Sequence, residues 1–147
     1  MKTYIAILRG INVSGQKKIN MKELKSSFEG AGYEKVLTYI QSGNIVFNSS
    51  EKDPQQLEKA IEKMILDKFQ FVVPVIIRTA DQLKSTIKNN PYLEEKNLDE
   101  AKLYFTLLAE SPSPENLKKL SDFQSEPDRF EITPTVVYVY CPNGYGV

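Results

Sequence analysis

The chain has no histidine and only one cysteine, Cys141, among its 147 residues. Histidine is the side chain that most often acts as a general base and as a transition-metal ligand, so the chain lacks the commonest residue for both roles. A single cysteine excludes a disulfide within the chain and any zinc or iron–sulfur site that needs several thiolates. We therefore predict no metal and no cofactor. The sparse cysteine suits a reducing, cytoplasmic compartment.

Net charge and long apolar runs are also absent. The 19 basic and 19 acidic residues cancel, so no overall field draws the chain to nucleic acid or to an anionic membrane. The apolar stretch before Arg9 is five residues long, YIAIL. It is too short for a signal-peptide core, and no run approaches the length of a membrane span. These absences argue against membrane and nucleic-acid partners.

Arginine is scarce as well, because only Arg9, Arg78 and Arg129 occur among the basic residues. A guanidinium can hold a planar anion with two parallel hydrogen bonds, whereas lysine offers a point charge. Arg9 and Arg78 each end a predicted strand, and Arg129 lies between Asp128 and Glu131. We interpret Arg78 and Arg129 as ion-pair partners, which leaves Arg9 as the candidate for a function.

The pattern of apolar residues predicts an α+β fold. The first half alternates short apolar runs with amphipathic stretches that begin after the capping residues Asn20 and Asp53. The predicted strands are residues 3–9, 36–40, 45–47 and 71–78. Pro74 favours an edge position for the last of them. Residues 1–78 are therefore expected to form a ferredoxin-like βαββαβ unit.

The second half, residues 79–147, begins to repeat this pattern. It predicts a helix after Thr79, a polar loop at residues 89–99, and a second helix from Pro114. Three strands are expected at residues 102–108, 130–132 and 135–140. The order αβαββ is one helix short of a second unit of the same kind. We expect an incomplete related unit, truncated before a C-terminal helix, and a homo-oligomer formed through the apolar surface that the truncation would expose.

The predicted strand order places one group of polar residues at a single sheet edge. In such a unit the first two strands run parallel with the third between them, so the end of the first strand meets the hairpin after the second. The expected ligand-binding residues there are Arg9, Gly10, Asn12, Gln41, Ser42 and Asn44. A guanidinium, carboxamides, a hydroxyl and backbone N–H groups exposed at glycines suit an anion or a planar polar group.

Turn chemistry offers a second explanation, because asparagine, serine and glycine are the residues that tight turns require. The loop of residues 10–20 is long for a strand–helix connection, which favours a functional surface. Our leading hypothesis is a small-molecule binding module for an anionic or nucleotide-like ligand. The alternatives are a phosphatase-like hydrolase, by loose analogy with acylphosphatases, and a structural or partner-binding domain. Whether the chain is an enzyme stays open, and no catalytic residue is assigned.

Two separated segments carry a resemblance to a known family. Residues 4–13 (YIAILRGINV) and 39–47 (YIQSGNIVF), followed late in the chain by residues 142–146 (PNGYG), resemble the bacterial family called domain of unknown function 1697. Ser14 departs from the glycine that is frequent there. The resemblance implies a fold and no activity, and its motif residues include Arg9, Gly10, Asn12, Gln41, Ser42, Gly43 and Asn44. Members of that family continue with a helix and a Thr-Arg-Asn-Trp motif, which implies a truncated member.

Overall fold

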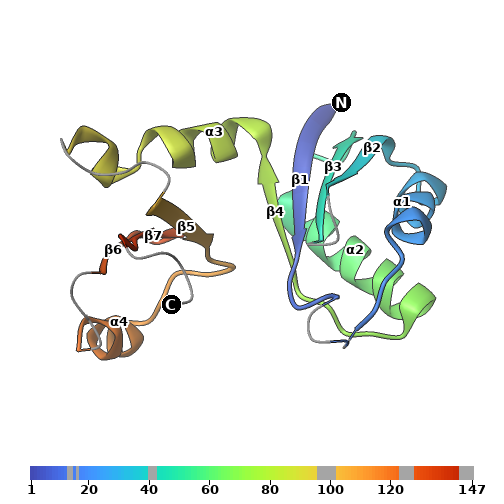
Figure 1. Ribbon diagram of the computed structural model, residues 1–147. Helices are drawn as coiled ribbons and strands as arrows, with labels where there is room; N and C mark the ends of the chain where they lie inside the picture. Colours follow the sequence, from blue (N-terminus) through green and yellow to red (C-terminus); the bar gives the residue numbers. More distant parts are fainter. Residues whose placement is uncertain (13–14, 16, 40–42, 96–101, 123–127, 143–147) are drawn as a thin grey trace. The chain divides into compact units, whose positions relative to one another are not determined.

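The computed structural model describes residues 1–12, 15, 17–39, 43–95, 102–122 and 128–142 (Figure 1). The chain divides into two compact units, Met1–Leu83 and Lys84–Val147. Two antiparallel sheets and four α-helices within the described residues give a mixed α+β architecture. In the same part of the chain, no helix combines the length and the apolar character needed to cross a bilayer.

The first unit is built on a four-stranded sheet. Its strands are β1 (Lys2–Leu8), β2 (Glu34–Tyr39), β3 (Asn44–Ser49) and β4 (Val75–Thr79). Their order across the sheet is β2-β3-β1-β4. Because β3 is antiparallel to both β1 and β2, those two strands run parallel with β3 between them, as the sequence predicts. The end of β1 therefore lies at the same edge of the sheet as the connection between β2 and β3.

Two helices, α1 (Met21–Gly30) and α2 (Pro54–Phe69), cover one face of this sheet (Figure 1). Asn20 begins α1, because its side chain accepts hydrogen bonds from two backbone N–H groups of the first turn at 2.9 and 3.2 Å. Asp53 begins α2 by accepting from the Gln55 N–H at 3.0 Å. These caps satisfy donors that have no partner inside the helix. They fix where each helix starts.

The main core lies between the sheet and these two helices. Alternate strand residues point to one face and meet the apolar stripes of the helices. The buried residues on the strands are Tyr4, Ala6, Leu8, Val36, Ile45, Phe47, Val75 and Ile77. Those on the helices are Leu24, Phe28, Leu57, Ile61 and Ile65. The opposite face of the sheet carries a second apolar set, which is only half-buried: Ile5, Ile7, Val46 and Ile76.

The start of β4 differs most from the predicted strand boundaries. The sequence predicts a strand at residues 71–78, whereas β4 begins at Val75, directly after Pro74. Proline has no N–H to donate to a ladder, and the Pro74 carbonyl instead accepts a hydrogen bond from the Arg9 N–H at 3.0 Å. The edge position that Pro74 predicts for this strand is confirmed. The first strand also ends earlier than predicted, because β1 ends at Leu8 and Arg9 lies just beyond it.

The second unit contains a smaller antiparallel sheet with the strand order β5-β7-β6. The elements of this half of the chain are α3 (Ala80–Lys88), the 3-10 helix η2 (Pro91–Glu94), β5 (Leu103–Leu107), α4 (Pro114–Ser121), β6 (Arg129–Ile132) and β7 (Val136–Tyr140). Tyr92, Val136 and Tyr138 form its core. The helices and strands follow the predicted order αβαββ. The segment predicted as a polar loop differs, because it contains η2.

Candidate functional site

The predicted site lies where β1 ends and β3 begins. The Leu8 N–H donates to the Gly43 carbonyl at 2.9 Å, and Ile7 pairs with Asn44 in the ladder between β1 and β3. Arg9 follows directly, with its backbone held on the other side by the segment before β4. The end of β1 is therefore in backbone contact with the chain that leads into β3. Strand order alone predicts this juxtaposition.

Gly43 permits the close approach of these two segments. Its φ of +84° lies in the left-handed region that residues with a Cβ rarely adopt. A Cβ at this position would lie 2.9 Å from the Leu8 carbonyl oxygen and 3.1 Å from two side-chain carbons of Ile11. Both the backbone conformation and the packing therefore require glycine here.

The loop between β1 and α1 is anchored by two buried isoleucines. Ile11 and Ile19 are 2 % and 3 % exposed and belong to the main core. Between them, Asn12 Oδ1 accepts from the Ile19 N–H at 2.8 Å, and Asn12 Nδ2 donates to the Ile19 carbonyl at 3.1 Å. Lys17 Nζ donates to the Val72 carbonyl at 2.9 Å, which ties the loop to the segment before β4. The described part of the loop is thus held at several points.

These contacts give Asn12 a structural role that the sequence analysis does not assign. Its carboxamide donates and accepts within the loop, and its backbone adopts a φ of +54°. Asparagine tolerates this left-handed conformation better than most residues. Asn12 therefore maintains the shape of the loop that begins at Arg9, and a direct contact between Asn12 and a ligand stays a prediction.

The three arginines differ in what holds their guanidinium groups. Arg129 Nη1 forms an ion pair with Glu95 at 3.0 Å, and this hydrogen bond raises its pKa. Arg78 Nη1 donates to the Ile77 carbonyl at 3.0 Å, and burial lowers its pKa. The predicted ion pair is confirmed for Arg129, although its partner is Glu95 and not a neighbour in the sequence. Arg9 is exposed, and within the described ranges no hydrogen bond or ion pair to its guanidinium is found.

Gly10 extends this exposed end of the strand. Its φ is +77°, and nothing lies within 4 Å of the place that a Cβ would occupy. Backbone N–H groups next to a left-handed residue can form a concave site for an anion. Beside the same loop, Asn12, Lys18 and Glu23 border a hollow of about 530 Å³, whose lining includes both a cation and a carboxylate. The Arg9 and Gly10 end is therefore the more suitable place for an anion.

The remaining predicted residues are only partly placed. Gln41 and Ser42 lie outside the described residues, and Asn44 is half-buried at the start of β3. Sequence reasoning missed Tyr39, which ends β2, pairs with Asn44 across the ladder and is 68 % exposed. The alternation of the predicted strand 36–40 was the available signal, because it puts Tyr39 on the face opposite to Val36.

Among the described residues, neither Cys141 nor the acidic side chains form a competing site. Cys141 is buried, and burial raises the pKa of its thiol, which keeps it protonated. In the part of the chain that the structure describes, no group of three or more cysteine, aspartate and glutamate side chains could hold a metal ion. A buried free cysteine packs as a small apolar side chain, which accounts for Cys141.

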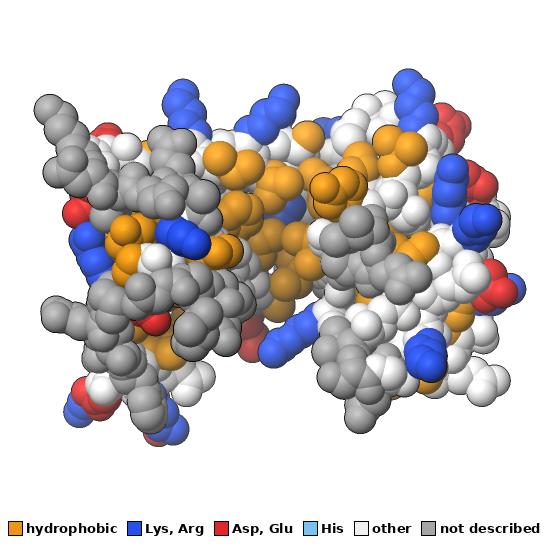
Figure 2. All heavy atoms as spheres, in the orientation of Figure 1, with side chains coloured by type: hydrophobic (Ala, Val, Ile, Leu, Met, Phe, Trp, Pro, Cys, Tyr) orange, Lys and Arg blue, Asp and Glu red, His pale blue; other side chains and the backbone are white. Residues whose placement is uncertain are grey.

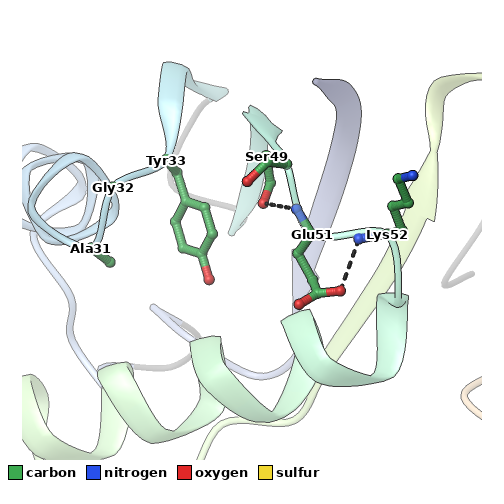
Figure 3. A pocket seen from close by; sticks show the side chains of 7 residues that line it. Ala31, Gly32, Tyr33, Ser49, Glu51 and Lys52 are labelled. Atoms are coloured by element: carbon green, nitrogen blue, oxygen red, sulfur yellow. Dashed lines mark hydrogen bonds between the residues drawn. The ribbon is translucent and has the colours of Figure 1, made fainter.

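A second polar hollow lies at the opposite edge of the first sheet, where α1 and β3 end (Figure 3). Its volume is about 440 Å³, and Tyr33, Ser49 and Glu51 are among the residues that line it. Ser49 Oγ accepts from the Glu51 N–H at 3.1 Å. Glu51 Oε1 accepts from the N–H groups of Lys52 and Asp53 at 2.8 and 3.0 Å. These groups organise the turn that leads into α2, so the fold itself accounts for them.

The fold and this edge define a small mixed α+β protein of two units, with an exposed arginine where the first strand ends. A family model described as "Protein of unknown function (DUF1697)" matches residues 1–138, and the chain belongs to this family. Among solved structures, the chain is similar to the conserved bacterial protein SP0830 from Streptococcus pneumoniae. The TM-score is 0.74 and the identity is 24 %, over 95 % of this chain and 77 % of that one. At this identity the likeness shows the fold alone. No curated protein matches the chain.

Proposed function

We propose that the first unit is a ferredoxin-like module that binds a small anionic ligand at its strand-end edge, with Arg9 as the anchor. The strand order β2-β3-β1-β4 and two helices on one face support the ferredoxin-like assignment. The observation that carries the binding role is the exposed Arg9 guanidinium. It has no partner among the described residues, whereas Arg78 and Arg129 both donate to protein oxygens.

The chemistry of this edge favours an anion. The Arg9 guanidinium can hold a carboxylate or a phosphate with two parallel, charge-assisted hydrogen bonds. The backbone of Arg9 is held in place, because its N–H donates to the Pro74 carbonyl and the following loop is anchored in the core. A pre-organised site loses less conformational entropy when a ligand binds. The proposed ligand-binding set is Arg9, Gly10, Asn12, Gln41, Ser42 and Asn44, in which Asn12 acts by holding the loop.

A hydrolase would need one further side chain at the same edge. It needs a carboxamide close to the bound phosphate to orient a water molecule, and Asn44 begins the strand beside Arg9. Turnover of an acyl phosphate or an aryl phosphate that disappears in Asn44→Ala would support this alternative. Phosphate binding without turnover supports the binding module alone.

A titration with inorganic phosphate tests the binding proposal. In ¹H–¹⁵N NMR spectra we expect the amide signals of Gly10, Gly43 and Asn44 to shift on addition of phosphate. Arg9→Lys keeps the charge but removes the two-pronged donor, so the affinity should fall by about fivefold or more, which corresponds to about 1 kcal/mol. If phosphate shifts none of these amides, or if Arg9→Lys binds as tightly as the unmodified protein, Arg9 is not an anion anchor.

A further inference from the structure

The sheet face away from α1 and α2 carries a row of side chains at the edge where β1 ends. The ladders pair Tyr39 with Asn44 and Asn44 with Ile7. Directly paired residues project to the same face of a sheet. Because Ala6 and Ile45 are fully buried on the helix-covered face, this row lies on the opposite face. Tyr39, Asn44 and Ile7 therefore stand side by side on three neighbouring strands.

This face is apolar and incompletely covered. Figure 2 shows hydrophobic side chains gathered over β1 and β4 of the first unit. Ile5, Ile7 and Ile76 are half-buried there, whereas Tyr39 on β2 is 68 % exposed. A large exposed aromatic ring next to an apolar surface is a suitable platform for another flat ring.

The distance from Tyr39 to the anion anchor suits a ligand of modest length. Neighbouring strands lie about 4.8 Å apart, so Tyr39 on β2 is about 10 Å from Ile7 on β1. Arg9 follows Ile7 by two residues, about 7 Å along the chain. The alternation of β1 places Ile5 and Ile7 on this face, and Arg9 follows at its margin, just beyond the end of the strand. A ligand that meets both Tyr39 and Arg9 must extend across β3.

We propose that the anionic ligand of this edge also carries a flat aromatic ring, which stacks on Tyr39 while the anionic group meets Arg9 and the Asn44 side chain lies between them. This inference rests on the anion site proposed above and adds Tyr39 as the residue that selects the ring. A nucleoside monophosphate has the required features, namely a planar base, a polar middle and a phosphate at the other end.

The test compares three probes that share a phosphate group: inorganic phosphate, ribose 5-phosphate and AMP. Stacking of a base on an aromatic side chain contributes about 1–3 kcal/mol, so AMP should bind at least about fivefold more tightly than ribose 5-phosphate. Tyr39→Thr, which keeps a residue suited to a strand, should abolish this preference. Tyr39→Phe keeps the ring and should retain the preference within about twofold.

Leu37→Thr provides the matched control, because Leu37 lies on the same strand and face as Tyr39 and is 63 % exposed. We expect the AMP preference of Leu37→Thr to equal that of the unmodified protein. Equal affinities for AMP and ribose 5-phosphate, or a preference that survives Tyr39→Thr, would overturn the assignment of Tyr39 while the anion site stands. If none of the three probes binds, the anion site itself is wrong and this inference fails with it. Unchanged NMR dispersion confirms that each variant is folded.

Discussion

The two edges of the first sheet use their polar groups differently. At the edge where β3 ends, Ser49 and Glu51 bond to backbone N–H groups, and the Tyr4 hydroxyl donates to the Glu51 carbonyl at 2.7 Å. At the edge where β1 ends, the backbone of Arg9 is bonded but no described residue holds its guanidinium. Folding accounts for the polar groups of the first edge. We expect the charge at Arg9 to contribute little to folding, as the proposed binding role requires.

We expect the closely packed backbone that supports Arg9 to be sensitive to substitution. Gly43→Ala forces a Cβ into a left-handed conformation and against the Leu8 carbonyl oxygen. We expect the free energy of unfolding to fall by about 2–3 kcal/mol, measured by urea denaturation. Gly10→Ala is the control, because it has a similar φ of +77° but open space around the Cβ position. It should cost only about 1 kcal/mol, and equal losses for both variants would contradict the packing argument.

Asn12 belongs to the Arg9 edge and yet stabilises the fold. Asn12→Ala removes both hydrogen bonds to Ile19 and leaves these backbone groups without their partner. The expected loss is about 1–2 kcal/mol in the free energy of unfolding, together with weaker phosphate binding because the loop loses its shape. A variant of normal stability that no longer binds phosphate would instead make Asn12 a direct ligand-binding residue.

The structural role of the edge where β3 ends should be measurable as a loss of stability in alkaline solution. Burial, followed by the charges of Glu51 and Asp53, raises the pKa of Tyr4 above its ordinary value of 10.0. As the pH rises, the phenolic proton of Tyr4 is therefore lost from the unfolded chain before it is lost from the folded one. The free energy of unfolding should fall above about pH 10. Tyr4→Phe should cost about 1 kcal/mol at pH 7 through the lost hydrogen bond, and its free energy of unfolding should fall less as the pH rises above about 10. A stability that falls equally steeply in both proteins would contradict this role for Tyr4.

Sequence reasoning could predict the position of Arg9 because that position depends only on strand order. Alternation, caps and turn residues determine where strands and helices begin, and in such a unit the parallel first and second strands bring the end of β1 to the hairpin. The contact between Asn12 and Ile19 was out of reach, because it depends on the path of a loop. Strand alternation indicates the exposed position of Tyr39, but the polar composition of this edge does not distinguish a tyrosine as a site residue.

The second unit shows a different limit of prediction. Residues 89–99 are rich in polar residues and were expected to form a loop, yet Asn90 and Tyr92 are 8 % and 2 % exposed. The Asn90 side chain accepts from the Tyr92 N–H at 3.0 Å and begins η2, which brings Tyr92 into the core of the second unit. Composition does not reveal that a single aromatic residue in a polar segment is an anchor.

The proposal that Arg9 serves binding and not folding can be tested with a pair of charge-matched variants. Arg9→Gln and Lys59→Gln each remove one positive charge from an exposed position of the first unit. Both should change the free energy of unfolding by less than about 1 kcal/mol. Isothermal titration with inorganic phosphate should show at least about tenfold weaker binding for Arg9→Gln and an almost unchanged affinity for Lys59→Gln. Equal affinities in the two variants, or an Arg9→Gln protein that unfolds, would contradict the account.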